Sequence, residues 1–119
     1  MTTIGVTFAE ALERLAAEPA ERSVRLFAHG TLEVKLYAPR GYDPQGPHAR
    51  DEIYVVAEGT GEFVSADARR PFGPGDFLFA PAGVVHRFEN FTDDFAVWVF
   101  FYGPAGGEVP SAQPPAAGS

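Results

Sequence analysis

The sequence contains no cysteine and only three histidines in 119 residues. Without cysteine the chain forms no disulfide, no cysteine zinc site and no thiol nucleophile, so a metal site would depend on histidine and carboxylate side chains. Basic residues are also scarce, since nine Lys and Arg stand against sixteen Asp and Glu, for a formal net charge of -7. A chain with this charge lacks the basic surface that binds nucleic acid or anionic lipid. We therefore expect neither nucleic acid nor a membrane as a partner.

Long apolar runs and targeting signals are missing as well. No window approaches the roughly 18 consecutive apolar residues of a transmembrane helix. The N-terminal residues carry no basic group, and Glu10 and Glu13 interrupt the next apolar residues, so no secretory signal is recognisable. We expect a cytoplasmic protein. The length and the 45% hydrophobic content are those of one folded domain.

The distribution of turns and apolar residues predicts one helix followed by strands. Thr7 and Glu10 form a capping box before residues with helical spacing, and Pro19 ends this helix near Ala17. Short alternating, β-branched and aromatic runs then follow, separated by glycine and proline, which is typical of an all-β sandwich or barrel. The predicted strands are Val24–Ala28, Leu32–Tyr37, Glu52–Ala57, Gly61–Ser65, Phe77–Ala80, His86–Glu89 and Phe95–Tyr102.

These elements divide the chain into three parts. Residues 1–22 form an N-terminal helical segment and residues 23–103 a barrel. Residues 104–119 are rich in glycine and proline and have no periodic apolar face, so we expect a flexible tail.

The most informative motif lies between Gly75 and Asn90. Gly75, Pro81, Gly83, His86 and Asn90 have the spacing G(X)5PXG(X)2H(X)3N. The glycine turns the chain into a strand, the proline and second glycine form the next turn, and the histidine is placed on the next strand. This stretch resembles the second conserved motif of the cupin family.

The first cupin motif, G(X)5HXH(X)3-4E(X)6G, is partly present. The required six residues lie between Glu52 and Gly59, and the required three lie between His48 and Glu52, so His48 occupies the second-histidine position. The first-histidine position falls on Gly46, which offers no ligand and leaves room for water or substrate. Gln45 is not expected to replace it, because in an extended segment it would face the opposite side.

The resemblance implies an all-β double-stranded β-helix, the jelly-roll barrel of cupins, with one short N-terminal helix. It also implies a divalent transition metal held by His48, Glu52 and His86. Two imidazoles and a carboxylate form a facial triad with open positions, which suits Fe and is compatible with Mn, Ni, Zn or Cu. The alternative is that His86 is an ordinary core histidine and that the loss of one motif histidine has weakened or removed metal binding.

Five further residues are candidates for binding a small molecule: Arg50, Tyr37, Tyr54, Phe88 and Trp98. Arg50 has the charge and the planar donors to anchor an anionic group. It would equally suit an ion pair or exposure at the barrel rim. The aromatic residues could line a pocket or simply fill the core of a small barrel.

Two functions from different classes fit these residues. The first is a metal-dependent enzyme, oxygenase-like or isomerase-like, that acts on a small polar substrate. The second is a non-catalytic module that binds a small ligand, with structural metal or none.

A short barrel also leaves edge strands to cover, and Leu26, Phe27, Leu32, Val34 and Leu36 supply more apolar surface than one strand face can bury. We therefore expect a homodimer.

Overall fold

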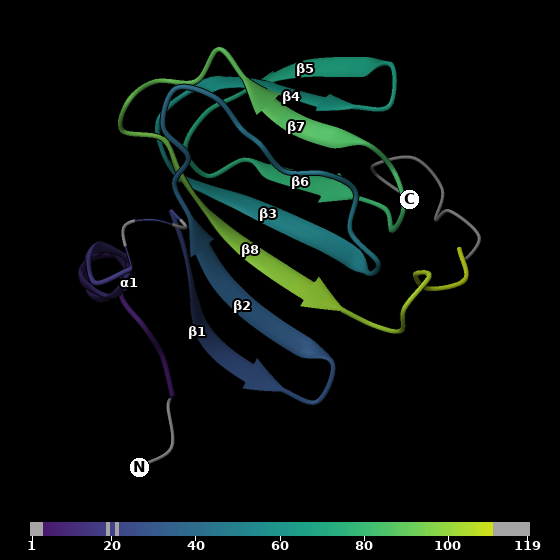
Figure 1. Ribbon diagram of the computed structural model, residues 1–119, viewed down its shortest axis with the longest axis horizontal. Helices are drawn as coiled ribbons and strands as arrows, with labels where there is room; N and C mark the ends of the chain where they lie inside the picture. The colour runs from purple at the N-terminus through teal and green to yellow at the C-terminus, as the bar shows by residue number, and fades with distance from the viewer. Residues whose placement is uncertain (1–3, 19, 21, 111–119) are drawn as a thin grey trace, which may run out of the picture.

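Two antiparallel sheets face each other in the computed structural model, which describes residues 4–18, 20 and 22–110 (Figure 1). The larger sheet has five strands in the order β1 (Ser23–His29), β2 (Leu32–Tyr37), β8 (Ala96–Tyr102), β3 (Asp51–Glu58) and β6 (Phe77–Ala80). The smaller sheet has three strands in the order β5 (Ala68–Phe72), β4 (Gly61–Ser65) and β7 (His86–Glu89). The predicted all-β jelly-roll fold is confirmed.

The helix α1 (Phe8–Ala16) covers the outer face of the larger sheet. Its predicted capping box is present: the Thr7 amide donates to Glu10 Oε1 and the Glu10 amide donates to Thr7 Oγ1, each at 3.0 Å. The helix buries Ala11 and Leu15 against outward-facing residues of the sheet, which are Val24, Leu26, Leu36 and Ala96, together with Ala38 just after β2. None of the helices in the described part of the chain is both long and apolar enough to cross a bilayer.

The main core lies between the two sheets. Alternate residues of β3, such as Tyr54 and Val56, point inward, while Ile53 and Val55 point to the outer face. Inward side chains of both sheets then pack into one cluster, rich in aromatic rings: Tyr54, Val56, Phe63, Phe72, Leu78, Ala80, Phe88, Phe95, Val97 and Val99.

An eighth strand, β5, was not predicted from the sequence. Its residues Ala68–Phe72 are mostly exposed and include Arg69, Arg70 and Pro71, which do not resemble a strand pattern. Proline cannot donate to a neighbouring strand, and it is tolerated here because β5 is an edge strand that pairs only with β4. The strand exists because tertiary pairing outweighs its weak local propensity.

Residues 104–110, the described part of the predicted tail, run beside the start of β3. The Gly106 amide donates to the Ala49 carbonyl at 2.7 Å, and the Glu108 amide donates to Asp51 Oδ2 at 2.8 Å. The remainder of the predicted tail, residues 111–119, lies outside the described residues. The segment after β8 therefore supports the entrance to β3.

We expect Gly59→Ala to lower the free energy of unfolding by about 2 kcal/mol or more. Gly59 has φ +90°, and a Cβ there would lie 2.6 Å from the Phe95 Cα, a backbone atom that cannot rotate away. Gly46→Ala is the matched control, because a Cβ at Gly46 meets nothing within 4 Å. Urea denaturation measures both variants, and equal stability of the two would contradict the prediction.

Candidate metal centre

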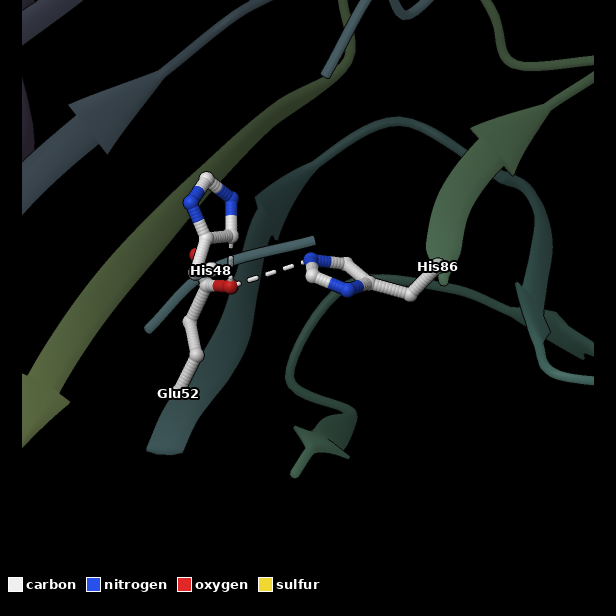
Figure 2. A group of neighbouring side chains, drawn as sticks. All are labelled: His48, Glu52 and His86. Carbon is white, nitrogen blue, oxygen red and sulfur yellow. Dashed lines mark ion pairs between the residues drawn. The ribbon is translucent and has the colours of Figure 1, made fainter. Parts of the chain in front are cut away.

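His48, Glu52 and His86 come together between the two sheets (Figure 2). His48 lies in the loop before β3, Glu52 lies on β3, and His86 begins β7 on the opposite sheet. One ligand atom from each of the three residues lies within 4.8 Å of the others. Glu52 Oε1 is 3.0 Å from His86 Nε2 and 3.6 Å from His48 Nε2. The three side chains predicted from the sequence motifs thus form one group that could hold a metal.

The orientation of His86 is set by the backbone. Its Nδ1 lies 2.9 Å from the Val84 carbonyl, to which it donates, so Nε2 is the nitrogen that faces Glu52. Metal-binding histidines commonly use one ring nitrogen in this way to fix the other as a ligand. The Tyr54 hydroxyl lies 3.0 Å from the same Nε2 atom. His86 is therefore held with its ligand nitrogen directed into the site.

Glu52 is the residue whose surroundings best suit a bound cation. Its side chain is almost fully buried, and Oε1 has no hydrogen-bond partner among the described residues, although His86 Nε2 is close. A carboxylate without compensation is costly to bury. Two ligand atoms at right angles on one ion, each at about 2.1 Å, are separated by about 3.0 Å, which matches the Glu52–His86 spacing. The donor set fits a divalent transition metal.

The irregular loop of residues 38–50 is organised by Asp43. The Asp43 carboxylate accepts hydrogen bonds from the Tyr37 hydroxyl on β2, from Gln45 Nε2 at 2.6 Å, and from the Phe88 amide on β7 at 2.8 Å. One side chain thus ties the loop to both sheets. Asp43 carries no motif signal, so the sequence analysis missed it.

Gln45 reaches the site, contrary to the expectation from strand alternation. That expectation assumed an extended segment, but β3 begins only at Asp51. Because Gln45 donates its amide nitrogen to Asp43, its oxygen Oε1 points inward, 3.0 Å from His48 Nε2 and 3.2 Å from the Tyr54 hydroxyl. Gly46, by contrast, is exposed and a Cβ there would meet only open space. The additional oxygen atom beside the metal-binding group thus belongs to Gln45, while a side chain at position 46 would point away from the group.

Burial and neighbouring charges shift the pKa values of the site. Burial lowers the pKa of His48, and the charge of Glu52 only partly offsets this, so His48 is neutral near pH 7. Burial also acts to lower the pKa of His86, but the contacts to Glu52 and the Val84 carbonyl outweigh it and raise the pKa overall. Burial, followed by the charge of Glu52, raises the pKa of Tyr54 well above its usual value. Tyr54 therefore keeps its proton.

A cavity of about 280 Å³ opens beside the metal-binding group. It is bounded by Gln45, His48 and Glu52 on the metal side and by residues of β2 and β8 on the other, among them Lys35, Tyr37, Val99 and Phe101. Of the residues predicted to bind a small molecule, Tyr37 lines this cavity. Lys35 was not singled out from the sequence, although it is the single lysine of the chain.

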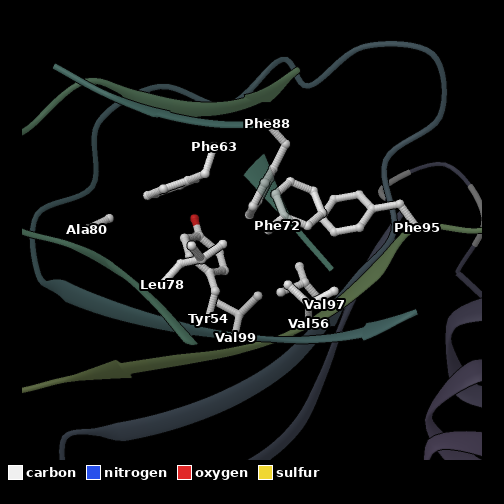
Figure 3. Close-up of a cluster of buried hydrophobic side chains, with 10 residues drawn as sticks. All are labelled: Tyr54, Val56, Phe63, Phe72, Leu78, Ala80, Phe88, Phe95, Val97 and Val99. Carbon is white, nitrogen blue, oxygen red and sulfur yellow. The ribbon is translucent and has the colours of Figure 1, made fainter. Parts of the chain in front are cut away.

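The other predicted binding residues lie elsewhere. Arg50 donates to the Thr31 carbonyl, with its guanidinium 5.7 Å from the centre of the Phe101 ring. Tyr54 and Phe88 belong to the main core, where Figure 3 shows the Tyr54 hydroxyl at the edge of the aromatic cluster. Trp98 is on the outer face of the larger sheet, 6.2 Å from Phe8 between ring centroids. Among these four, Tyr54 is the one with a polar atom next to the metal-binding group.

Comparison with known proteins agrees with this architecture. The family model of the cupin domain matches residues 33–102. The chain belongs to the cupin family. A crystal structure of a cupin 2 conserved barrel domain protein from Salinispora arenicola has a TM-score of 0.62 and 27% sequence identity, covering 87% of this chain and 89% of that one.

Two curated relatives complete the comparison. An uncharacterized protein of Streptomyces coelicolor is 32% identical over 98 residues, which are 78% of this cupin and 93% of the relative. A dimethylsulfoniopropionate lyase of Ruegeria pomeroyi is 34% identical over 80 residues, which are 65% of this cupin and only 40% of the lyase. The similarity thus covers less than half of the lyase.

We expect Asp43→Ala to destabilise this cupin by about 1–3 kcal/mol, because it leaves the Phe88 amide without its acceptor and releases the loop from β2. The control is Asp93→Ala, which removes an exposed carboxylate from the turn before β8. Thermal denaturation followed by circular dichroism measures both. A melting temperature of Asp43→Ala equal to that of the control would show that the loop does not depend on Asp43.

Proposed function

We propose that this cupin binds a divalent transition metal and acts on a small polar molecule in the adjoining cavity. The observation that carries the proposal is the buried oxygen of Glu52, which lacks a hydrogen-bond partner among the described residues and faces His86 Nε2 at 3.0 Å. His48, Glu52 and His86 are the proposed ligands. Gln45 Oε1 is proposed as a fourth, since its amide is already turned toward the group. The metal is Fe, Mn, Ni, Zn or Cu.

A metal bound there would act as a Lewis acid toward an oxygen atom of the substrate or as a centre that binds oxygen. The chain itself supplies a proton at the Tyr54 hydroxyl, which lies beside the ligands and stays protonated because burial raises its pKa. Val99 and Phe101 form apolar walls that exclude water from one side of the cavity. These residues orient a small substrate and hold a proton near its reacting end.

The reaction classes proposed for the enzyme are oxygenase-like, isomerase-like and lyase chemistry. The lyase class is included because the barrel is 34% identical to part of a dimethylsulfoniopropionate lyase. The alternative is a binding module without catalysis. It is favoured by the contacts of Tyr54, whose hydroxyl is fully engaged with Gln45 and His86, as expected for a structural role.

We expect the purified protein to retain a divalent metal and the variant His86→Ala to lose it, with an affinity at least about 100-fold lower. Gln45→Ala should weaken metal binding by about tenfold, because one of four donors is removed. His29→Ala is the control, since His29 ends β1 away from the site. Elemental analysis and competition with a chelator measure these affinities.

Equal metal content in the wild type and in His86→Ala would contradict the metal site. If Gln45→Ala binds the metal as tightly as the wild type, Gln45 is not a ligand and the ligands are His48, Glu52 and His86. The metal-free and reloaded proteins are then incubated with a panel of small polar molecules that includes dimethylsulfoniopropionate. Turnover that appears only on reloading supports the enzyme, whereas binding without turnover across the panel supports the module.

We also propose a homodimer formed through the outer face of the larger sheet. Phe27, Val34, Val55, Trp98 and Phe100 line an apolar groove of about 410 Å³ there, together with Ile4, Gly5, Val6 and Leu26. Leu36, which was expected to contribute, is instead covered by α1. Contiguous apolar surface of this kind is typical of interfaces between proteins.

Light scattering should return about twice the chain mass of 12.8 kDa at micromolar concentration. Val55→Asp should shift the protein toward the monomer, because it places a charge in the groove while the inward face of β3 is unchanged. Circular dichroism checks that the variant is folded. A wild-type mass near that of one chain would contradict the dimer.

A further inference from the structure

We propose that the cavity beside the metal ligands selects substrates with a carboxylate group, and that Lys35 binds this group. The inference rests on the proposed function, because it concerns the far end of the same cavity. It assigns the chemical class of the substrate and the residue that binds it, which the motifs do not provide for this chain.

The first argument is the position of Lys35. It lies on β2 directly opposite Val99 of β8, and Val99 lies directly opposite Tyr54 of β3. Side chains at directly opposed positions of neighbouring strands point to the same face of the sheet. Lys35 therefore points to the cavity side with Tyr54, and the two Cα atoms are separated by two strand spacings, which is about 10 Å.

The second argument is charge. Among the described residues, no carboxylate lies within the 4.0 Å of a salt bridge to the Lys35 ammonium group. Glu33, on the same strand, is 3.9 Å from Arg25, and Asp43 accepts hydrogen bonds from three residues, whereas Glu52 lines the same cavity as Lys35 without a salt bridge to it. The single lysine of the chain thus brings a positive charge without a salt-bridge partner to a cavity whose one lining carboxylate is Glu52.

The third argument is the shape of the cavity between Lys35 and the ligands. Val99 and Phe101 form an apolar floor between the two ends, and the volume of about 280 Å³ lies below the usual range for drug-sized ligands. A fitting molecule is a short carboxylic acid with a few apolar carbons and a polar reacting end. In the metal-free protein the charge of Glu52 disfavours a carboxylate at that end of the cavity, whereas the ammonium group of Lys35 attracts one.

The test uses propionate and propionamide, which have nearly the same shape but differ in charge. Binding to the metal-free protein is followed by nuclear magnetic resonance titration, so that a carboxylate on the metal does not contribute. We expect the wild type to prefer propionate by about tenfold or more. Lys35→Met should abolish the preference, and Lys35→Arg should largely keep it.

Arg70→Met is the matched control. Arg70 carries the same charge, but it is exposed on β5 of the other sheet and lies outside the cavity. We expect this variant to keep the preference for propionate. The inference is overturned if wild type binds propionamide as well as propionate, if Lys35→Met keeps the preference, or if Arg70→Met loses it equally.

The outcome is separate from that of the proposed function. Metal content is measured on the same Lys35→Met preparation, and we expect it to equal that of the wild type, because Lys35 is no ligand. A protein that binds no metal but prefers propionate through Lys35 would refute the metal site and keep this inference. A protein that binds metal but shows no preference for propionate would refute this inference and keep the metal site.

Discussion

The structure of this cupin depends on one buried carboxylate, that of Glu52. A charged group placed between two sheets has lost its hydration, and the protein must compensate it there. His86 approaches from the opposite sheet with its free nitrogen, Gln45 and His48 approach from the loop, and no described group donates a hydrogen bond to Glu52 Oε1. His86 is the one charged partner that the described residues offer to Glu52, at 3.0 Å. A cation at the centre of His48, Glu52 and His86 would compensate the carboxylate further, so the packing supports the proposed metal site as the motifs do.

The position of these donors depends on two different kinds of support. Glu52 and His86 are fixed by strand pairing and by the hydrogen bond of His86 to the Val84 carbonyl. Gln45 and His48 belong to a loop without regular structure, which is held mainly by the Asp43 carboxylate. Asp43 therefore acts on the site through Gln45, whose amide it turns so that the oxygen faces inward. The strands of the barrel thus position Glu52 and His86, and the loop positions Gln45 and His48.

Much of the fold was predictable because strand alternation and turn residues are local signals. The bounds of β2, β4, β6 and β7 agree with the sequence, as does the capping box of α1. β5 was missed because its pairing with β4 outweighs the two arginines and the proline. Gln45 was missed for a related reason: alternation was extended into a loop where it does not apply. Motif spacing located His48, Glu52 and His86, whereas the contacts that orient them, such as those of Asp43, join residues distant in sequence.

Tyr54 connects the core to the site. Its ring packs edge-on against Phe63 and Phe88 in the aromatic cluster (Figure 3). Its hydroxyl lies 3.2 Å from Gln45 Oε1 and 3.0 Å from His86 Nε2. The ring cannot move without disturbing the core, because close-packed interiors resist small displacements. The hydroxyl is thereby held at one point beside the ligands, with its proton retained. The polar end of the cavity thus has a fixed geometry, so under the proposed function the residues of β2, Lys35 and Tyr37, are left to distinguish one small molecule from another.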